Sequence, residues 1–263
     1  MQSFRRHDVP AWIGDCMAGV QRWAASRNFE YRMLGDEFLE LVPHWYRAKA
    51  HGYITVVADL ARLVLIRRNL ELGYDRVLWI DADVVVFDPS ALSVDVEAPY
   101  AYSREVWVER SAGGALKFLA KVNNSACLFS NSREAFAHLN GYIARCKSTI
   151  AGLRTITDHT IVGTRLLTAL NRKKPLPILP GFALFSPAIL EAILESNRSL
   201  LMAFAKLHEG RIGAANLCNF LKQWNNGIND EMASAVLARL AANQSLLALD
   251  RGFPMHAGRG QTR

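Results

Sequence analysis

Residues 76–87 read RVLWIDADVVVF, a run of apolar side chains interrupted by two aspartates. Val, Ile and Trp favour extended backbone, and a strand that is apolar on both faces is typical of a sheet covered by helices. The turn signal Asp88-Pro89-Ser90 ends the run. A helical pattern from Tyr53 to Leu72, closed by Gly73, precedes it. This order predicts an α/β fold with a mostly parallel central sheet flanked by helices.

The chain has 263 residues, of which 51% are hydrophobic, so it can bury one sizeable core. We therefore expect a single domain over residues 1–263, with a helical pattern from Pro187 to Leu249 interrupted around Trp224–Asn229. Residues 251–263 are rich in Gly and basic side chains, which predicts a flexible tail. Further helices are expected at Pro10–Ala25, Asp36–Val42, Arg133–Cys146 and Thr157–Asn171, and further strands at Tyr100–Ser103, at Ser125–Ser130 and near Phe185.

A formal charge of +7 concentrates phosphates and anionic lipid head groups near the surface, so peripheral contact with a membrane is compatible with the composition. The basic residues are scattered and lack a nucleic-acid signature, so no nucleic-acid partner is expected. No signal peptide or membrane-spanning segment is visible. The cysteines lie far apart and form no CxxC pair, which favours a reducing, cytoplasmic compartment; they are Cys16, Cys127, Cys146 and Cys218.

The two aspartates of the apolar run are the first candidate site. In one continuous strand, Asp81 and Asp83 point to the same face because side chains alternate. Two adjacent carboxylates repel each other, and a bound cation would offset that cost. Mg²⁺ and Mn²⁺ prefer oxygen ligands, and such sites are often completed by water and substrate phosphates. An isolated Asp-x-Asp in a turn occurs by chance, but a pair inside a buried element is costly without a function.

The preceding helix carries a second candidate pair. Asp59 and Arg62 are three residues apart on a helix that is apolar nearly all round, so their side chains face each other. A structural ion pair explains this pattern. A pair that binds the hydroxyls of a sugar or ribose explains it equally, since both side chains form directional hydrogen bonds.

Two segments resemble a known family. Ala58-Asp59-Leu60-Ala61-Arg62, followed about one helix later by Leu78-Trp79-Ile80-Asp81-Ala82-Asp83-Val84-Val85, is similar to the DxD sugar-transferase pattern of glycosyltransferase family 32 and of the clostridial glucosylating toxins. The resemblance covers roughly residues 2–89 and implies a GT-A-like domain.

The resemblance assigns roles to these residues. It implies that Asp59 and Arg62 contact the donor sugar, that Trp79 lies at the donor site, and that Asp81 and Asp83 are the catalytic pair that handles ribose, sugar and metal. It implies Mn²⁺ or Mg²⁺ as cofactor and a nucleotide sugar as donor. It also implies retention of the anomeric configuration.

Three more residues join by weaker similarity. Asn124-Ser125-Ala126-Cys127-Leu128-Phe129 resembles a strand of glycosyltransferase family 8 whose asparagine approaches the donor sugar, which would be Asn124. His256 is a candidate third metal ligand, or an ordinary histidine of a basic tail. Asp158 is a candidate on the acceptor side, or a helix cap.

Two departures from family 32 limit the resemblance. Gly73-Tyr74-Asp75-Arg76 stands where that family has Gly-Gly, which is closer to family 8. The first strand of the family, which helps to hold the nucleotide base of the donor, is nearly absent before Gln2. A truncated first strand is therefore expected.

The sequence therefore predicts a glycosyltransferase that moves a hexose from a UDP- or GDP-sugar to a saccharide, a glycolipid or another hydroxyl acceptor. Two alternatives stay open: a haloacid-dehalogenase-like phosphatase, which also uses an Asp-x-Asp at a strand end, and a non-catalytic saccharide-binding domain. The absence of GxGxxG disfavours a dinucleotide oxidoreductase. Donor sugar, base, acceptor and linkage depend on loops that the sequence does not define.

Overall fold

The computed structural model describes residues 1–111, 113–208, 210–219 and 228–242. The predicted tail at residues 251–263, and the end of the predicted helical region, lie outside the described residues. Within those ranges, no helix combines the length and the apolar character needed to cross a membrane. The four cysteines are buried free thiols.

The helices form close to their expected positions. α1 spans Ala11–Ser26, and α3 spans Ile54–Glu71 and ends before Gly73, whose φ of +99° is a backbone conformation that glycine adopts without strain. α4 (Arg133–Gly152) begins after Ser132, whose side chain accepts a hydrogen bond from the amide of Ala135. The other helical segments are η1 (Asp36–Leu41), α2 (His44–Lys49), η2 (Pro89–Ala91), α5 (Thr164–Lys173), α6 (Pro187–Leu194), α7 (Arg198–Lys206) and α8 (Asp230–Ala242).

The strands form short sheets that are mixed in direction. The elements are β1 (Gln2–Ser3), β2 (Met33–Leu34), β3 (Arg76–Ile80), β4 (Val84–Val86), β5 (Tyr100–Arg110), β6 (Leu116–Ser130), β7 (Phe182–Leu184) and β8 (Ala214–Asn216). Their orders are β1-β2, β3-β6-β5 and β4-β8-β7. Only β1-β2 and β7-β8 are parallel among these ladders; β3-β6, β5-β6 and β4-β8 are antiparallel.

The predicted α/β class is confirmed, but the predicted mostly parallel sheet is wrong. For β5 and β6 the physical reason is that a hairpin connects them, and a hairpin can only join antiparallel strands; β3-β6 and β4-β8 are antiparallel as well. A hydrogen bond from the Ile80 amide to the Met1 carbonyl, 3.0 Å long, places the start of the chain beside β3.

The apolar run at residues 76–87 forms two strands in two different sheets. β3 ends at Ile80 and β4 begins at Val84, and the amide of Val84 donates to the carbonyl of Asp81 (3.2 Å) across the turn between them. The prediction of one continuous strand is therefore wrong. The chain must turn here because β3 pairs with β6 whereas β4 pairs with β8.

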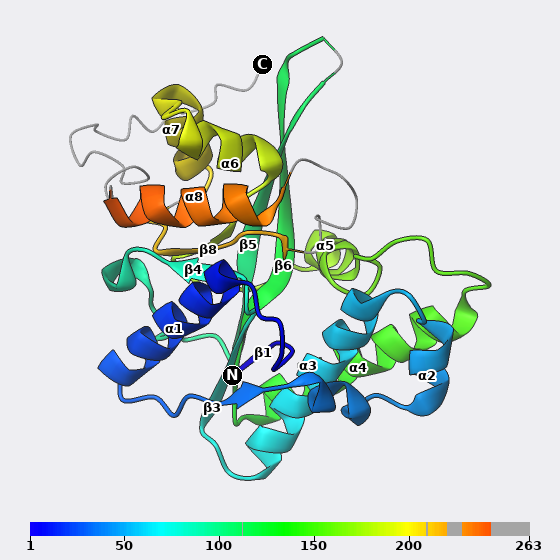
Figure 1. Cartoon of the computed structure of the whole chain (residues 1–263). Coiled ribbons are helices and arrows are strands. Elements are labelled where there is room, and N and C mark those ends of the chain that lie inside the picture. The colour runs from blue at the N-terminus through cyan, green and yellow to red at the C-terminus, as the bar shows by residue number, and fades with distance from the viewer. Residues whose placement is uncertain (112, 209, 220–227, 243–263) are drawn as a thin grey trace, which may run out of the picture.

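Two of the three apolar clusters among the described residues lie on opposite sides of the strands. In Figure 1, α2, α3 and α4 lie to the right of β3 and β6, and α1, α6 and α8 lie to the left. The first core contains Leu60, Leu63 and Ile66 of α3 with Phe129 of β6, and the second contains Trp12 with residues of α6 to α8. The turn after β3 lies where the two halves meet, and the candidate site is built around it.

In the described part of the region after Pro187, α6, α7 and α8 are helical as expected, whereas β8 is not. Residues 214–216 were expected to be helical, but they form a strand between β4 and β7. This strand brings the C-terminal half of the chain beside the turn that carries Asp81 and Asp83.

Candidate active site

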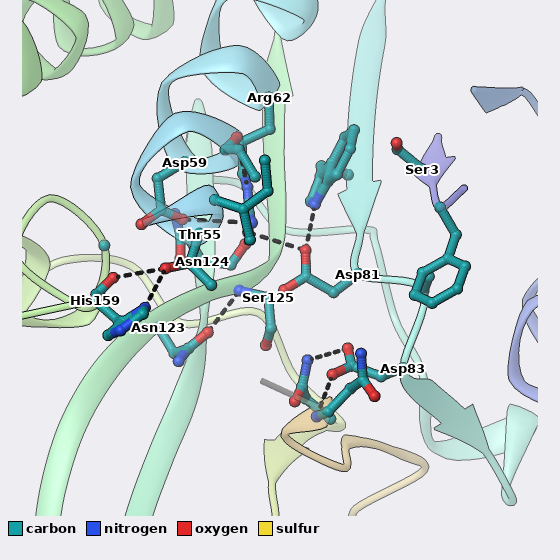
Figure 2. A pocket seen from close by; sticks show the side chains of 18 of the residues that line it. Ser3, Thr55, Asp59, Arg62, Asp81, Asp83, Asn123, Asn124, Ser125 and His159 are labelled. Carbon is teal, nitrogen blue, oxygen red and sulfur yellow. Dashed lines mark hydrogen bonds and ion pairs between the residues drawn. The ribbon is translucent and has the colours of Figure 1, made fainter. Parts of the chain in front are cut away.

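A cavity of about 380 Å³ opens at the C-terminal end of β3 (Figure 2). Its walls come from the start of the chain, η1, the first half of α3, the turn after β3, β6, the loop before α5, and β8. Every predicted donor-site residue and both aspartates of the Asp-x-Asp line it: Asp59, Arg62, Trp79, Asp81, Asp83 and Asn124. The structure thus brings together residues that are up to 65 positions apart in the chain.

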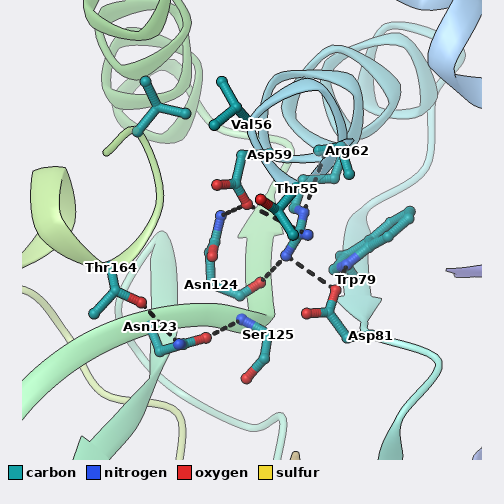
Figure 3. Close-up of polar contacts among 12 residues, drawn as sticks. Thr55, Val56, Asp59, Arg62, Trp79, Asp81, Asn123, Asn124, Ser125 and Thr164 are labelled. Carbon is teal, nitrogen blue, oxygen red and sulfur yellow. Dashed lines mark hydrogen bonds and ion pairs between the residues drawn. The ribbon is translucent and has the colours of Figure 1, made fainter. Parts of the chain in front are cut away.

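Arg62 is the centre of a buried polar network (Figure 3). Its Nη1 lies 3.0 Å from Asp81 Oδ1 and donates to the backbone carbonyl of Asn124 at 2.8 Å. Its Nη2 lies 3.3 Å from Asp59 Oδ1. Arg62 and Asp59 are each only 6% exposed, so both partners have left water and depend on this pairing. One guanidinium therefore ties α3 to β6 and to the turn after β3.

Asn124 and Trp79 complete the network. Asn124 Nδ2 donates to Asp59 Oδ1 at 3.0 Å, and the indole Nε1 of Trp79 donates to Asp81 Oδ1 at 2.7 Å. The Trp79 ring stacks on Phe38, and the guanidinium of Arg62 lies 5.3 Å from the ring centroid. Asp59 and Arg62 of α3 are thus held in one arrangement by Asn124 of β6. Trp79 of β3 packs against the same arginine.

Asp83 belongs to the same cavity but has different partners. Its Oδ1 accepts a hydrogen bond from Asn216 Nδ2 (2.6 Å), and its Oδ2 accepts one from the amide of Asn219 (2.8 Å). Among the described residues, no cation forms a salt bridge with Asp83. Its carboxyl group is hydrogen-bonded only to neutral amides.

The electrostatics of the aspartates follow from burial and from one another. Burial raises the pKa of Asp59 to about 6, although the nearby charge of Arg62 opposes this shift. Burial also raises the pKa of Asp81, again opposed by Arg62. The pKa of Asp83 is raised by burial and by the negative charge of Asp81.

These residues fit a divalent cation. The cavity lining carries the carboxylates Asp36, Asp59, Asp81 and Asp83 against the guanidinium groups of Arg5 and Arg62, an excess of two negative charges when all are ionised. No cluster of three or more His, Cys, Asp or Glu side chains suited to a metal is present in the described part of the chain. Two carboxylates are nevertheless a common protein contribution to Mg²⁺ sites that substrate phosphates complete. The predicted ligand His256 lies outside the described residues.

Asp158 does not cap a helix, since Gly163 is the N-cap of α5; its side chain instead holds the turn that precedes this helix. Its Oδ1 accepts hydrogen bonds from the amide and hydroxyl of Thr160, both 2.7 Å, and its Oδ2 lies 3.1 Å from Arg165. It does not line the cavity, whereas its neighbour His159 does. This turn also explains why α5 begins at Thr164 and not at the predicted Thr157.

Sequence reasoning missed several residues at the site. Thr55, one turn before Asp59 on α3, donates from its hydroxyl to the carbonyl of His159 (3.2 Å), and both line the cavity. Asn123 Oδ1 accepts from the amide of Ser125 (2.6 Å) and shapes the opposite wall. The spacing of Thr55 and Asp59, one helical turn apart, is the signal that could have found Thr55.

Comparisons with known proteins leave the family open. No protein-family model matches the chain, and no curated protein sequence matches it significantly. Solved structures do resemble it. One is titled "Crystal structure of a glycosyltransferase involved in the glycosylation of the major capsid of PBCV-1"; it shares 11% identity, with 89% of this chain and 96% of that chain covered and a TM-score of 0.46. A likeness this slight carries no argument about function, so the functional conclusion depends on the geometry of the cavity.

Proposed function

We propose that this chain is a glycosyltransferase that moves a hexose from a nucleoside-diphosphate sugar to a hydroxyl acceptor. The observation that carries the proposal is the cavity at the end of β3. There a buried network holds Arg62 between Asp59 and Asp81, while Asp83 has no cationic partner among the described residues. A cavity beyond the carboxyl end of a strand is where α/β proteins commonly bind nucleotides.

Asp59, Arg62 and Asn124 would hold the donor sugar. Their polar atoms are fixed by one another, so they are preorganised to bind sugar hydroxyls with little loss of conformational freedom. Trp79 supplies a flat apolar wall whose indole holds Asp81 in place.

Asp81 and Asp83 would hold Mn²⁺ or Mg²⁺. Such a cation, when bound, neutralises negative charge that develops on the diphosphate as it leaves. In the transfer, the bond between the anomeric carbon and the diphosphate oxygen breaks and a bond to the acceptor oxygen forms. The acceptor hydroxyl loses its proton to the released diphosphate or to water.

The finer expectations remain part of this proposal. The resemblance to families 32 and 8 supports retention of configuration and a UDP- or GDP-sugar donor. A saccharide or glycolipid is the expected acceptor, and peripheral contact with a membrane would suit the positive charge of the chain.

The two alternatives are less well supported. A haloacid-dehalogenase-like phosphatase needs a free aspartate nucleophile and a lysine beside it. Here Asp81 is ion-paired with Arg62, and no lysine is among the described residues that line the cavity. A non-catalytic saccharide-binding domain shares the cavity, so only an activity measurement separates it from the enzyme.

The test is a screen of UDP- and GDP-sugars for Mn²⁺-dependent donor hydrolysis or transfer. We expect Asp81→Asn and Asp83→Asn to lower the rate more than about 100-fold, because each removes a charge at the proposed cation site. Asp95→Asn is the matched control, since the Asp95 side chain is 90% exposed and does not line the cavity. Full activity in either site variant, or Mn²⁺-independent phosphatase activity in the wild type, would show that the proposal is wrong.

A further inference from the structure

One short segment makes three hydrogen bonds to Asp83. This segment, residues 216–219, begins at the last residue of β8 and is named here the Asp83 clasp. Asn216 Nδ2 donates to Asp83 Oδ1 (2.6 Å), and the amide of Asn219 donates to Asp83 Oδ2 (2.8 Å). The amide of Leu217 donates to the backbone carbonyl of Asp83 (3.0 Å). Both carboxylate oxygens and the main chain of one residue are thus held by a segment more than 130 positions later.

The orientation of the Asn216 amide is determined by its partners. Its Oδ1 accepts a hydrogen bond from the amide of Cys218 (2.7 Å), while its Nδ2 faces the carboxylate. A rotated amide would place oxygen against oxygen on one side and N–H against N–H on the other. Asn216 is only 4% exposed. It lies opposite Val84 in the β4-β8 ladder, and Val84 is the residue that follows Asp83.

The backbone of the clasp is bent to reach Asp83. Cys218 has a φ of +56°, a left-handed conformation that side-chain-bearing residues rarely adopt. Such a conformation persists where the surrounding structure demands it, and it is often found at functional sites. Here the bend points the amide of Asn219 at Asp83 Oδ2.

The clasp orients Asp83 without cancelling its charge. All its donors are neutral amides, in contrast to the guanidinium that pairs with Asp81. Each carboxylate oxygen keeps a further lone pair, and Asp83 lines the cavity. Partners of this kind, which bind a metal ligand and not the metal, commonly set the affinity of a site.

We infer that the Asp83 clasp fixes the carboxylate of Asp83 for a divalent cation, and that Asn216 is a positioning residue. This inference rests on the proposed function, since it concerns the same cation. It goes further by assigning a role in cation binding to a C-terminal strand that the sequence did not reveal.

The experiment compares Mn²⁺ binding by the wild type, Asn216→Ala and Asn171→Ala, read from the electron paramagnetic resonance signal of free Mn²⁺. Asn171 is the matched control because its Oδ1 also accepts one backbone hydrogen bond, from Leu176 (2.8 Å), but it does not line the cavity. We expect about 10- to 100-fold weaker Mn²⁺ binding in Asn216→Ala alone. Excess Mn²⁺ should restore much of its activity, which a merely structural defect would not allow.

The possible outcomes separate the two proposals. Equal Mn²⁺ affinity in Asn216→Ala and wild type would overturn the inference and leave the proposed function standing. No Mn²⁺ binding by the wild type would overturn both. If Asn216→Ala does not fold, Asn216→Ser replaces it. Serine keeps a hydroxyl donor, so the variant should lose Mn²⁺ affinity, but less than predicted for alanine. Mn²⁺ affinity equal to that of the wild type, together with a shifted melting temperature, would count against the inference.

Discussion

At the residue scale, Arg62 is the side chain that links the separate elements of the site. It contacts Asp59, Asp81 and the carbonyl of Asn124, which lie on three different elements. Asp59 and Arg62 lie i,i+3 on a helix, so the sequence indicated that they face each other. The structure adds Asp81 and Asn124, and a pair that looked local becomes the centre of the cavity wall. An ion pair and a sugar-binding pair are therefore compatible roles for the same two residues.

The fork shape of the guanidinium is testable with Arg62→Lys. Lysine keeps the charge but has one nitrogen, so it cannot reach Asp59, Asp81 and Asn124 together. We expect a loss of about 1–3 kcal/mol in the free energy of unfolding, since at least one buried acceptor loses its partner. Donor turnover should fall more than tenfold, because the donor wall loses its fixed geometry.

Arg68→Lys is the control for this variant. Arg68 is an exposed residue on the same helix, so its replacement should change neither stability nor turnover. Chemical denaturation and a steady-state assay measure the two effects. If Arg62→Lys matches Arg68→Lys in both, the network does not shape the site.

At the scale of elements, the close approach of the loop before α5 to α3 depends on Gly163. A Cβ at this position would lie 2.6 Å from Asp59 Oδ2 and 3.3 Å from Asn124 Oδ1. The first distance is shorter than any comfortable contact, and Asp59 cannot move without breaking its pairing with Arg62. The absence of a side chain at residue 163 is thus a condition for the geometry of the donor wall.

Gly163→Ala should therefore disturb the site, whereas Gly141→Ala should not. Gly141 lies within α4 with no atom within 4 Å of an added Cβ, so alanine there should stabilise the protein by about 1 kcal/mol through helix propensity. We expect Gly163→Ala to weaken donor binding, measured as KM or by calorimetry. Unchanged donor affinity in Gly163→Ala would show that Asp59 and Asn124 are not at the donor site.

The features that the sequence predicted at this scale are those encoded locally. The i,i+3 spacing of Asp59 and Arg62, and the apolar run before Asp81, need only helix and strand periodicity, and both led to residues that line the cavity. The boundaries of α1 and α3 likewise follow from local apolar patterns and from Gly73. The roles of these residues in sugar or metal binding remain predictions.

The features that the sequence did not predict depend on distant pairing. β8 has the sequence Ala-Ala-Asn, which contains no β-branched or aromatic residue, and it is a strand only because β4 and β7 flank it. Asn216 was missed for that reason. β5 and β6 also extend well beyond the predicted Tyr100–Ser103 and Ser125–Ser130, because charged cross-strand partners such as Glu105 and Lys121 obscured their pattern.

At the scale of the whole molecule, the buried aspartates of the cavity and His138 have opposite effects on the free energy of unfolding in mild acid. The raised pKa values of Asp59, Asp81 and Asp83 mean that the folded state takes up protons before the unfolded state does, which favours folding as the pH falls. His138 acts in the other direction. Burial, with a contribution from the charge of Lys174, lowers its pKa from 6.5 to about 4. The total slope of stability against pH therefore does not isolate either group.

The difference in the free energy of unfolding between a His138 variant and the wild type does isolate the contribution of His138. The neutral His138 ring stacks on Tyr100 at a centroid distance of 3.7 Å and is hydrogen-bonded to the Tyr102 hydroxyl (2.8 Å). Between the unfolded pKa of 6.5 and the folded value, the unfolded chain binds the proton first, so this contribution to stability is present at about pH 7 and is lost as the pH falls toward 4. His138→Gln cannot titrate, so its cost in unfolding free energy should shrink by about 1–2 kcal/mol between about pH 7 and about pH 5. A cost for His138→Gln that is constant with pH would mean that His138 is not held neutral by the fold.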